Sequence, residues 1–129
     1  MPRLTGSLED YLEAIYMLRR QNGEARITDL AERLGLSKPS ANRAVATLCE
    51  EGLATHERYG SVELTGAGER IARDVCFRHE ALLRFLMYNL GVDPAQAEED
   101  ACRMEHVISE ETLRKLIAYS EGHAPLQGE

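Results

Sequence analysis

The chain has 129 residues, of which 43% are hydrophobic and 29% charged, as is usual for a globular protein in water. No apolar run approaches the roughly 20 residues of a membrane-spanning helix. The N-terminus also lacks the apolar core of a signal peptide, so we expect a cytoplasmic protein with no membrane partner. The three cysteines are widely spaced and form no CxxC pair, which argues against a disulfide framework and against a zinc ribbon.

The net charge of −7 argues against a protein that binds nucleic acid, but the charges are unevenly distributed. Residues 33–49 contain Arg33, Lys38 and Arg43 and no acidic side chain. Acidic residues gather elsewhere, notably in "AEED" at 97–100. The negative net charge therefore weakens the case for a DNA-binding role without excluding it.

A helix is predicted over residues 7–21, because Leu8, Leu12 and Ile15 lie at helical spacing and Ser7 is a suitable N-cap. Its sequence is "SLEDYLEAIYMLRRQ". The following Asn-Gly pair predicts the end of this helix.

A pair of short helices follows. The first is predicted over residues 27–35, with Thr28 as its N-cap and Gly35 as its end. The second is predicted to begin after the N-cap Ser37 and to end at Gly52. Two helices joined by a short turn that contains glycine are typical of a helix-turn-helix.

Two short strands are predicted next, over residues 53–57 and 61–64, because hydrophobic and polar residues alternate there. The sequence "RYGS" would form the turn between them. A helix-turn-helix followed by a β-hairpin is a winged helix. This part of the chain therefore predicts a winged helix-turn-helix with a small wing.

The remainder is predicted to be helical. A long helix is expected over about residues 67–89, with Thr65 as its cap, and another over residues 94–108. The last helix is expected over residues 111–122, with Ser109 as its N-cap.

The fold class is thus mainly α, with two domains expected. Residues 1–70 would form the winged helix-turn-helix, and residues 71–129 would form an all-helical domain. Apolar residues of the later helices could form a dimer surface, or they could simply fill the core of one protomer.

The second helix of the predicted helix-turn-helix would enter the major groove with its N-terminal residues against base edges. Lys38 and Arg43 can bind phosphates, and Asn42 or Arg43 can read bases. The alternative is a winged helix used for protein contacts alone, but the acid-free segment favours DNA. The candidate DNA-binding residues are Arg26, Ser37, Lys38, Pro39, Ser40, Asn42 and Arg43, with Arg58 and Tyr59 in the wing.

Metal-ligating residue types recur at helical spacing. Cys102, Glu105 and His106 stand at i, i+3 and i+4, so in a helix they would share one face. A thiol, a carboxylate and an imidazole are all metal ligands. Asp10 and Glu13 would likewise share a face of the first helix. The alternative is a helix with one buried cysteine and two solvated polar residues, because spacing alone cannot show that these helices meet.

His79 is a further candidate ligand, in "FRHEAL" on the long helix. A single histidine among apolar residues is more often a hydrogen-bonded core residue than a ligand. Together, the six candidates offer three carboxylates, two imidazoles and one thiol on three predicted helices.

Several stretches of the chain resemble the diphtheria toxin repressor and manganese transport regulator family. They are "EDYLEAIYML", "ITDLAERLGLSKPSANRAVATLCEEGL", "LTGAGERIA", "RHEALLRFL" and "EEDACRMEHVISEE", and the resemblance covers about residues 5–120. It implies a homodimeric, metal-activated transcriptional repressor with an N-terminal winged helix and a helical metal-binding and dimerisation domain. Some members add a C-terminal SH3-like domain, and the length of this chain resembles that of the short, two-domain members.

The resemblance also implies ligands. Cys102, Glu105 and His106 match the family's ligand run, and the cysteine resembles the iron-responsive branch. Asp10 and Glu13 instead resemble the manganese branch.

The second metal site of the family is matched only in part. His79 matches a ligand there, whereas Leu83 and Glu98 stand where the iron branch has a carboxylate and a histidine. We expect this site to use Glu13 and Glu105 beside His79, with Glu80 and Glu98 as weaker candidates.

The expected cofactor is one or two divalent ions per protomer, Mn²⁺ or Fe²⁺, with Zn²⁺, Co²⁺, Ni²⁺ or Cd²⁺ able to bind in vitro. The expected partners are a second copy of the chain and double-stranded DNA with a pseudo-palindromic operator, and no small organic substrate. Two other hypotheses remain. One is a winged-helix regulator with Cys102 as a redox thiol. The other is a dinuclear metalloenzyme, although no Glu-x-x-His pair recurs on two helices.

Overall fold

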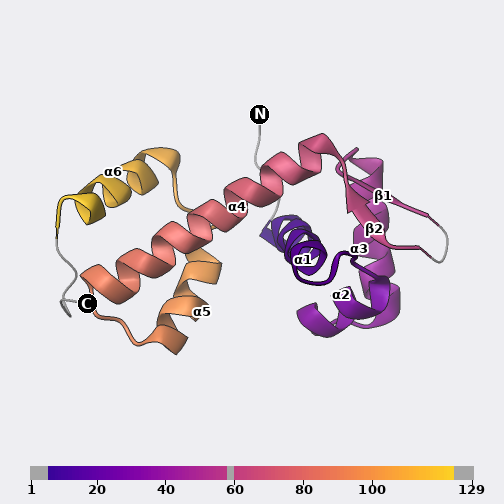
Figure 1. Ribbon diagram of the computed structural model, residues 1–129, viewed down its shortest axis with the longest axis horizontal. Helices are drawn as coiled ribbons and strands as arrows, with labels where there is room; N and C mark the ends of the chain where they lie inside the picture. The colour runs from indigo at the N-terminus through magenta and orange to yellow at the C-terminus, as the bar shows by residue number, and fades with distance from the viewer. Residues whose placement is uncertain (1–5, 58–59, 124–129) are drawn as a thin grey trace. The chain divides into compact units, whose positions relative to one another are not determined.

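The computed structural model describes residues 6–57 and 60–123. It divides into an N-terminal unit, Met1–Asp74, and a C-terminal unit, Val75–Glu129. The helix α4 (Gly66–Arg84) begins in the first unit and ends in the second (Figure 1). Among the described residues, no helix is long and apolar enough to cross a membrane.

The N-terminal unit has the predicted winged helix-turn-helix. Its helices are α1 (Gly6–Asn22), α2 (Ile27–Leu34) and α3 (Lys38–Glu50). The strands β1 (Ala54–His56) and β2 (Val62–Leu64) follow as an antiparallel hairpin. Both strands are shorter than the sequence pattern predicts, and Thr55 pairs with Glu63 at the centre of their register.

One apolar core holds this unit together. Helices α1 and α3 contribute residues three positions apart, as an amphipathic helix does when one face is buried. The core consists of Leu12, Ala14, Ile15, Leu18, Ala25, Leu30, Val45, Leu48, Leu53, Ala54, Val62 and Ala72.

Capping residues explain where α2 ends and where α3 begins, but not where α2 begins. Ser37 caps α3 as predicted, because its side chain accepts a hydrogen bond from the backbone N–H of Ser40. Gly35 ends α2 in the left-handed conformation at φ 67°, which glycine adopts without strain. The predicted N-cap Thr28 is wrong: Arg26 occupies that position, and its side chain makes no capping bond.

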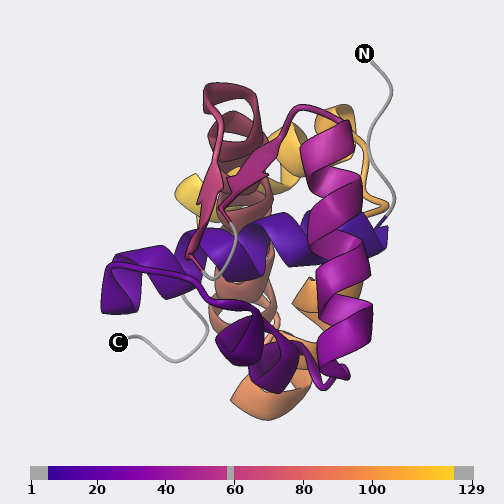
Figure 2. The ribbon, with the colours of Figure 1, turned by 90° about the vertical axis from the view of Figure 1, so that its right-hand side faces the viewer.

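Hydrogen bonds join the hairpin to the segment between α1 and α2. The hydroxyl of Ser61 accepts from the backbone N–H of Ala25 at 2.9 Å, and the N–H of Val62 donates to the carbonyl of Ala25 at 2.7 Å. The guanidinium of Arg19 donates to the carbonyl of Val62 at 3.2 Å. Figure 2 shows the hairpin, α1 and α3 of this unit together. These bonds fix the wing to the body of the unit.

The start of α4 lies very close to Leu53, in the segment between α3 and β1. A Cβ atom at Gly68 would lie 2.0 Å from the carbonyl oxygen of Leu53, so only glycine fits there. Thr65 caps α4 as predicted, accepting from the N–H of Gly68 at 3.1 Å, and its hydroxyl donates to the carbonyl of Gly52 at 2.8 Å.

The C-terminal unit contains the end of α4, the π-helical turn η1 (Phe85–Asn89), α5 (Pro94–Met104) and α6 (Glu110–Glu121). The predicted long helix therefore reaches Asn89, but its last turn is π-helical. The predicted helix over residues 94–108 is too long, because α5 ends at Met104. Ser109 caps α6 as predicted, accepting from the N–H of Thr112. The core of this unit consists of Leu82, Leu86, Ala97, Ala101 and Leu113.

Candidate metal centre and nucleic-acid interface

The six predicted metal ligands fall in both units. His79, Cys102, Glu105 and His106 belong to the C-terminal unit. Asp10 and Glu13 belong to the N-terminal unit, where they lie three residues apart on α1 and are both partly buried. Their participation in a common site with the other four stays a prediction.

His79 lies between two carboxylates of the C-terminal unit. Its Nδ1 is 2.6 Å from Oε1 of Glu105, and its Nε2 is 3.0 Å from Oε2 of Glu98. The side chain of Glu105 is fully buried, that of His79 is 16% exposed, and that of Glu98 is 55% exposed. The histidine is therefore no ordinary core residue, because both of its ring nitrogens face acidic oxygens.

The carboxylates change the proton affinity of this imidazole. The pKa of His79 is raised from 6.5 to about 9, mainly by its hydrogen bond to Glu105 and also by the negative charges of Glu105 and Glu98, which together outweigh its partial burial. In the metal-free protein at neutral pH, His79 is consequently an imidazolium ion.

Glu105 and His106 do not continue α5 but lie in the turn that follows it. The turn is closed by hydrogen bonds from the N–H groups of Glu105 and Ile108 to the carbonyls of Ala101 and Met104. His106 Nε2 lies 3.5 Å from Oε2 of Glu105. Glu105, the C-cap of α5, keeps helical backbone angles at φ −59° and ψ −25°, so the expected helical geometry extends from Cys102 to Glu105, and His106 lies in the turn beyond it.

The backbone of this turn is held from α4. Arg78 is only 6% exposed, and its Nε donates to the carbonyl oxygen of Glu105 at 2.7 Å. A buried charged side chain is stabilised when its N–H groups donate hydrogen bonds to acceptors in the protein. Arg78 therefore positions the turn that carries Glu105, a role that no motif or spacing in the sequence indicates.

The donor chemistry of this unit fits a divalent transition metal. His79, Glu98 and Cys102 each offer a ligand atom, and these atoms lie within 4.8 Å of one another. Imidazole, carboxylate and thiolate together suit borderline ions better than purely hard ones. Glu98 was a weaker candidate from the sequence, although it stands four residues before Cys102 on α5, which is the spacing of one helical turn.

The predicted DNA-reading face of α3 is exposed. Lys38, Asn42 and Arg43 lie on the surface, while Ala41 and Val45 on the opposite face are buried. The helix therefore presents its basic and amide side chains to solvent at its N-terminal end, where a recognition helix contacts base edges.

Hydrogen bonds pre-arrange this end of α3. The hydroxyl of Ser40 accepts from Arg43 at 3.1 Å and from the hydroxyl of Ser37 at 3.0 Å. Pro39 is exposed in the first turn, where proline costs no helical hydrogen bond. Arg26, at the start of α2, pairs with Glu24 at 3.2 Å. The two wing candidates, Arg58 and Tyr59, lie outside the described residues.

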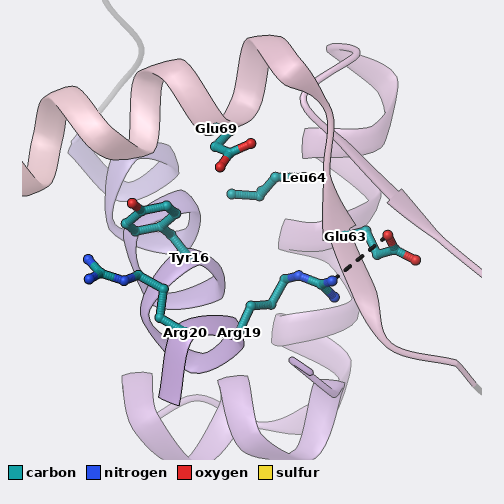
Figure 3. Close-up of a pocket in the computed structure, with 6 residues that line it drawn as sticks. All are labelled: Tyr16, Arg19, Arg20, Glu63, Leu64 and Glu69. Atoms are coloured by element: carbon teal, nitrogen blue, oxygen red, sulfur yellow. Dashed lines mark ion pairs between the residues drawn. The ribbon is translucent and has the colours of Figure 1, made fainter. Parts of the chain in front are cut away.

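A pocket of about 290 Å³ lies elsewhere in the N-terminal unit, between α1, β2 and the start of α4 (Figure 3). Arg19 and Glu63 form an ion pair of 3.9 Å across it. Arg20 lies over the ring of Tyr16 at 5.5 Å. None of the predicted metal or DNA ligands lines this pocket, whose residues are Tyr16, Arg19, Arg20, Glu63, Leu64 and Glu69.

Two family models match the chain. The N-terminal DNA-binding domain of iron-dependent repressors matches residues 3–62, and the metal-binding and dimerisation domain of iron-dependent repressors matches residues 65–122. Together they cover most of the chain and both structural units.

Named relatives agree with these models. The transcriptional regulator MntR of Escherichia coli O157:H7 is 40% identical over 116 residues, which are 90% of this chain and 74% of that protein. The HTH-type transcriptional regulator MntR of Bacillus subtilis is 35% identical over 120 residues, which are 91% of this chain and 84% of that protein.

Solved structures share the fold. A manganese-dependent transcriptional repressor in complex with manganese is 31% identical, with a TM-score of 0.78 over 87% of this chain and 51% of that one. The manganese regulator SloR is 26% identical, with a TM-score of 0.79 over 88% of this chain and 53% of that one. The chain thus spans about half the length of these solved structures.

The family and the named relatives are transcriptional regulators and not enzymes, which removes the metalloenzyme hypothesis. A DNA-binding domain precedes a metal-binding and dimerisation domain in the matched models, as the winged helix precedes the His79–Glu105 cluster here. The chain belongs to the iron-dependent repressor family of metal-dependent, DNA-binding transcriptional regulators.

Proposed function

We propose that this protein is a Mn²⁺- or Fe²⁺-activated repressor of metal-homeostasis genes, acting as a cytoplasmic homodimer on a pseudo-palindromic operator. The observation that carries the proposal is the fully buried carboxylate of Glu105 next to two imidazoles, those of His79 and His106. Neutral imidazoles and carboxylates are the donors that Mn²⁺ and Fe²⁺ accept in proteins. The manganese regulators among the relatives support the choice of metal.

The proposed ligands are Asp10, Glu13, His79, Cys102, Glu105 and His106. Four of them lie on or beside α4 and α5 of the C-terminal unit. Asp10 and Glu13 are added because the sequence resemblance places metal-binding carboxylates at these positions of the first helix. We assign residues 1–70 to the DNA-binding domain and residues 71–129 to the metal-binding and dimerisation domain.

The proposed mechanism uses the division of ligands between the domains. Without metal, carboxylates that approach one another repel, so the two domains would associate loosely. A divalent ion offsets this repulsion and fixes the domains together. In a dimer, this sets the spacing of two recognition helices to half-sites about 34–36 Å apart, or a multiple of that distance. Metal and DNA affinity are then coupled reciprocally, by roughly 1–3 kcal/mol.

The proposed DNA contacts come from the exposed end of α3 and from the wing. Lys38 would bind phosphate, and Asn42 and Arg43 would contact base edges. Ser37, Pro39 and Ser40 would approach the backbone of the groove. Arg26, Arg58 and Tyr59 complete the proposed interface.

The test is fluorescence anisotropy with DNA from the region upstream of the gene, at fixed salt and without oxygen. The metal-free protein should bind weakly, and Mn²⁺ or Fe²⁺ should strengthen binding. Glu105→Gln should fold and dimerise but lose the response to metal, whereas the exposed control Glu99→Gln should keep it. A full metal response in Glu105→Gln would contradict the ligand assignment.

Cys102 gives a second candidate signal because it is exposed, as a redox-sensing thiol must be. In this version, DNA binding would change with oxidant in the absence of added metal. The same anisotropy assay decides between the two: binding that responds to peroxide but not to Mn²⁺, Fe²⁺ or Zn²⁺ would favour the thiol.

A further inference from the structure

The pocket between α1, β2 and the start of α4 plays no part in the proposed binding of metal or DNA. It lies wholly in the N-terminal unit, and none of the proposed metal or DNA ligands lines it. Its volume of about 290 Å³ is near the lower end of the range of about 300–1,000 Å³ that is usual for small-molecule sites. A small ligand is therefore the kind of occupant that fits it.

The lining of this pocket carries charges of both signs. Arg19 and Arg20 come from α1, whereas the two carboxylates come from β2 and α4. Nη2 of Arg19 lies 3.9 Å from Oε1 of Glu63. Oε1 of Glu69 likewise lies 2.9 Å from Nη2 of Arg73. Since each carboxylate already has an arginine beside it, the charges balance except at Arg20, and the pocket favours a ligand that carries negative charge.

Arg20 has hydrogen-bond donors to offer such a ligand. Its guanidinium carbon lies 5.5 Å from the centre of the Tyr16 ring, which is a cation–π contact. This contact does not use the N–H groups of the guanidinium, which can donate to both oxygens of a carboxylate in a fork. Of the carboxylates that the structure describes, none pairs with Arg20, which is exposed to solvent.

The same pocket has apolar surface for the rest of a ligand. The Tyr16 ring and the Leu64 side chain are both partly buried, and Figure 3 shows them between Glu69 and the two arginines of α1. An inorganic anion would leave this surface uncovered. An organic acid with a short apolar or aromatic body would cover it, and removing apolar surface from water is favourable.

We propose that this pocket binds a small organic carboxylate, with its carboxylate group on Arg20 and its apolar body against Tyr16 and Leu64. The ligand would contact α1, β2 and α4 together, because all three elements line the pocket. It would therefore strengthen the attachment of strand β2, and with it the wing, to α1. The inference is independent of the proposed function, because this site requires neither metal nor DNA.

The test is an NMR titration of the isotope-labelled, metal-free, full-length chain with benzoate, in a buffer that contains neither phosphate nor carboxylate. Benzoate should shift the Nε–H signal of Arg20 and the backbone signals of Tyr16 and Leu64 to saturation, with a dissociation constant of about 1 mM or lower. Benzamide has the same shape without the charge, and it should bind about tenfold more weakly. Inorganic phosphate has the charge without the apolar body, and it should also bind about tenfold more weakly.

Arg20→Gln should weaken benzoate binding by about tenfold, because it removes the charge-assisted hydrogen bonds to the carboxylate. Arg33→Gln is the matched control: Arg33 is an exposed arginine of α2 in the same unit and does not line the pocket, so its loss should leave the titration unchanged. Circular dichroism verifies that both variants are folded. The inference is overturned if benzoate causes no saturable shift, if Arg20→Gln binds benzoate as tightly as the wild type, or if benzamide or phosphate binds as tightly as benzoate.

Discussion

Nδ1 of His79 and Oε1 of the fully buried Glu105 are 2.6 Å apart, which is a short hydrogen bond between an imidazole and a carboxylate. An imidazolium and a carboxylate at this distance stabilise each other in the metal-free protein. A metal ion that takes either group as a ligand must replace this contact. The pair therefore connects protonation, stability and metal binding.

The metal-free protein should lose stability as pH rises from 6.5 to 9. Since the pKa of His79 is raised from 6.5 to about 9, the folded state holds this proton more tightly than the unfolded state does. The contribution is complete below pH 6.5 and disappears through pH 9, by roughly 1–3 kcal/mol. Urea unfolding with a chelator present measures it. In Glu105→Gln the pH slope should be smaller, and an identical slope would contradict the assignment.

Gly68→Ala should destabilise the N-terminal unit by about 3 kcal/mol, because the new methyl group would overlap the carbonyl of Leu53. The nearest atom to a Cβ there is only 2.0 Å away, and it is backbone that cannot rotate aside. Gly66→Ala is the matched control, since its Cβ would meet only the side chain of Arg70, at 3.7 Å. Chemical unfolding of both variants compares them. If the two variants are equally stable, the backbone at Leu53 can move away from α4 at little cost, which would contradict this prediction.

Lys38→Ala and Arg43→Ala should separate affinity from sequence discrimination. Removing a phosphate contact at Lys38 should weaken binding to all DNA sequences alike and reduce the salt slope by about one. Loss of Arg43 should instead reduce the preference for operator over random DNA, by roughly 1–3 kcal/mol for a bidentate base contact. Arg73→Ala on α4 removes the same charge and should change neither quantity. Anisotropy at several salt concentrations gives all three results.

Cys102→Glu should shift the metal response towards Mn²⁺ and away from Zn²⁺, because a hard carboxylate replaces a soft thiolate. The measurement is the ratio of free Mn²⁺ to free Zn²⁺ concentrations that give half-maximal DNA binding. Cys102→Ser removes the thiolate without adding a carboxylate, and it should weaken the response to both ions. If the ratio is the same in wild type and Cys102→Glu, the residue at 102 does not select the metal.

Features set by local sequence were predictable. Ser37 and Ser109 were identified as N-caps because a hydroxyl before a helix has a local role. The predicted cap Thr28 failed for a non-local reason: Ala25 is held by Ser61 and Val62 of the hairpin, and the helix begins immediately after this fixed segment. N-cap prediction uses only neighbouring residues, so it cannot take account of the hydrogen bond between Ala25 and Ser61, which are thirty-six positions apart.

The candidate metal centre was only partly predictable. The helical spacing of Cys102, Glu105 and His106 continues past the true end of α5, because "MEHVIS" contains neither glycine nor proline to mark that end. The predicted helix is therefore too long, although Glu105, the C-cap of α5, still has helical backbone angles. Glu98 and Arg78 gained their importance from α4 and α5 meeting, which periodicity within one helix cannot reveal.

The boundary between the two units falls inside a continuous helix, α4, and not in a loop. A residue inserted there would turn everything downstream by about 100° and advance it by about 1.5 Å. An insertion between α5 and α6 would have no such effect. Among relatives, we therefore expect the segment between Ala72 and Leu82 to keep a constant number of residues.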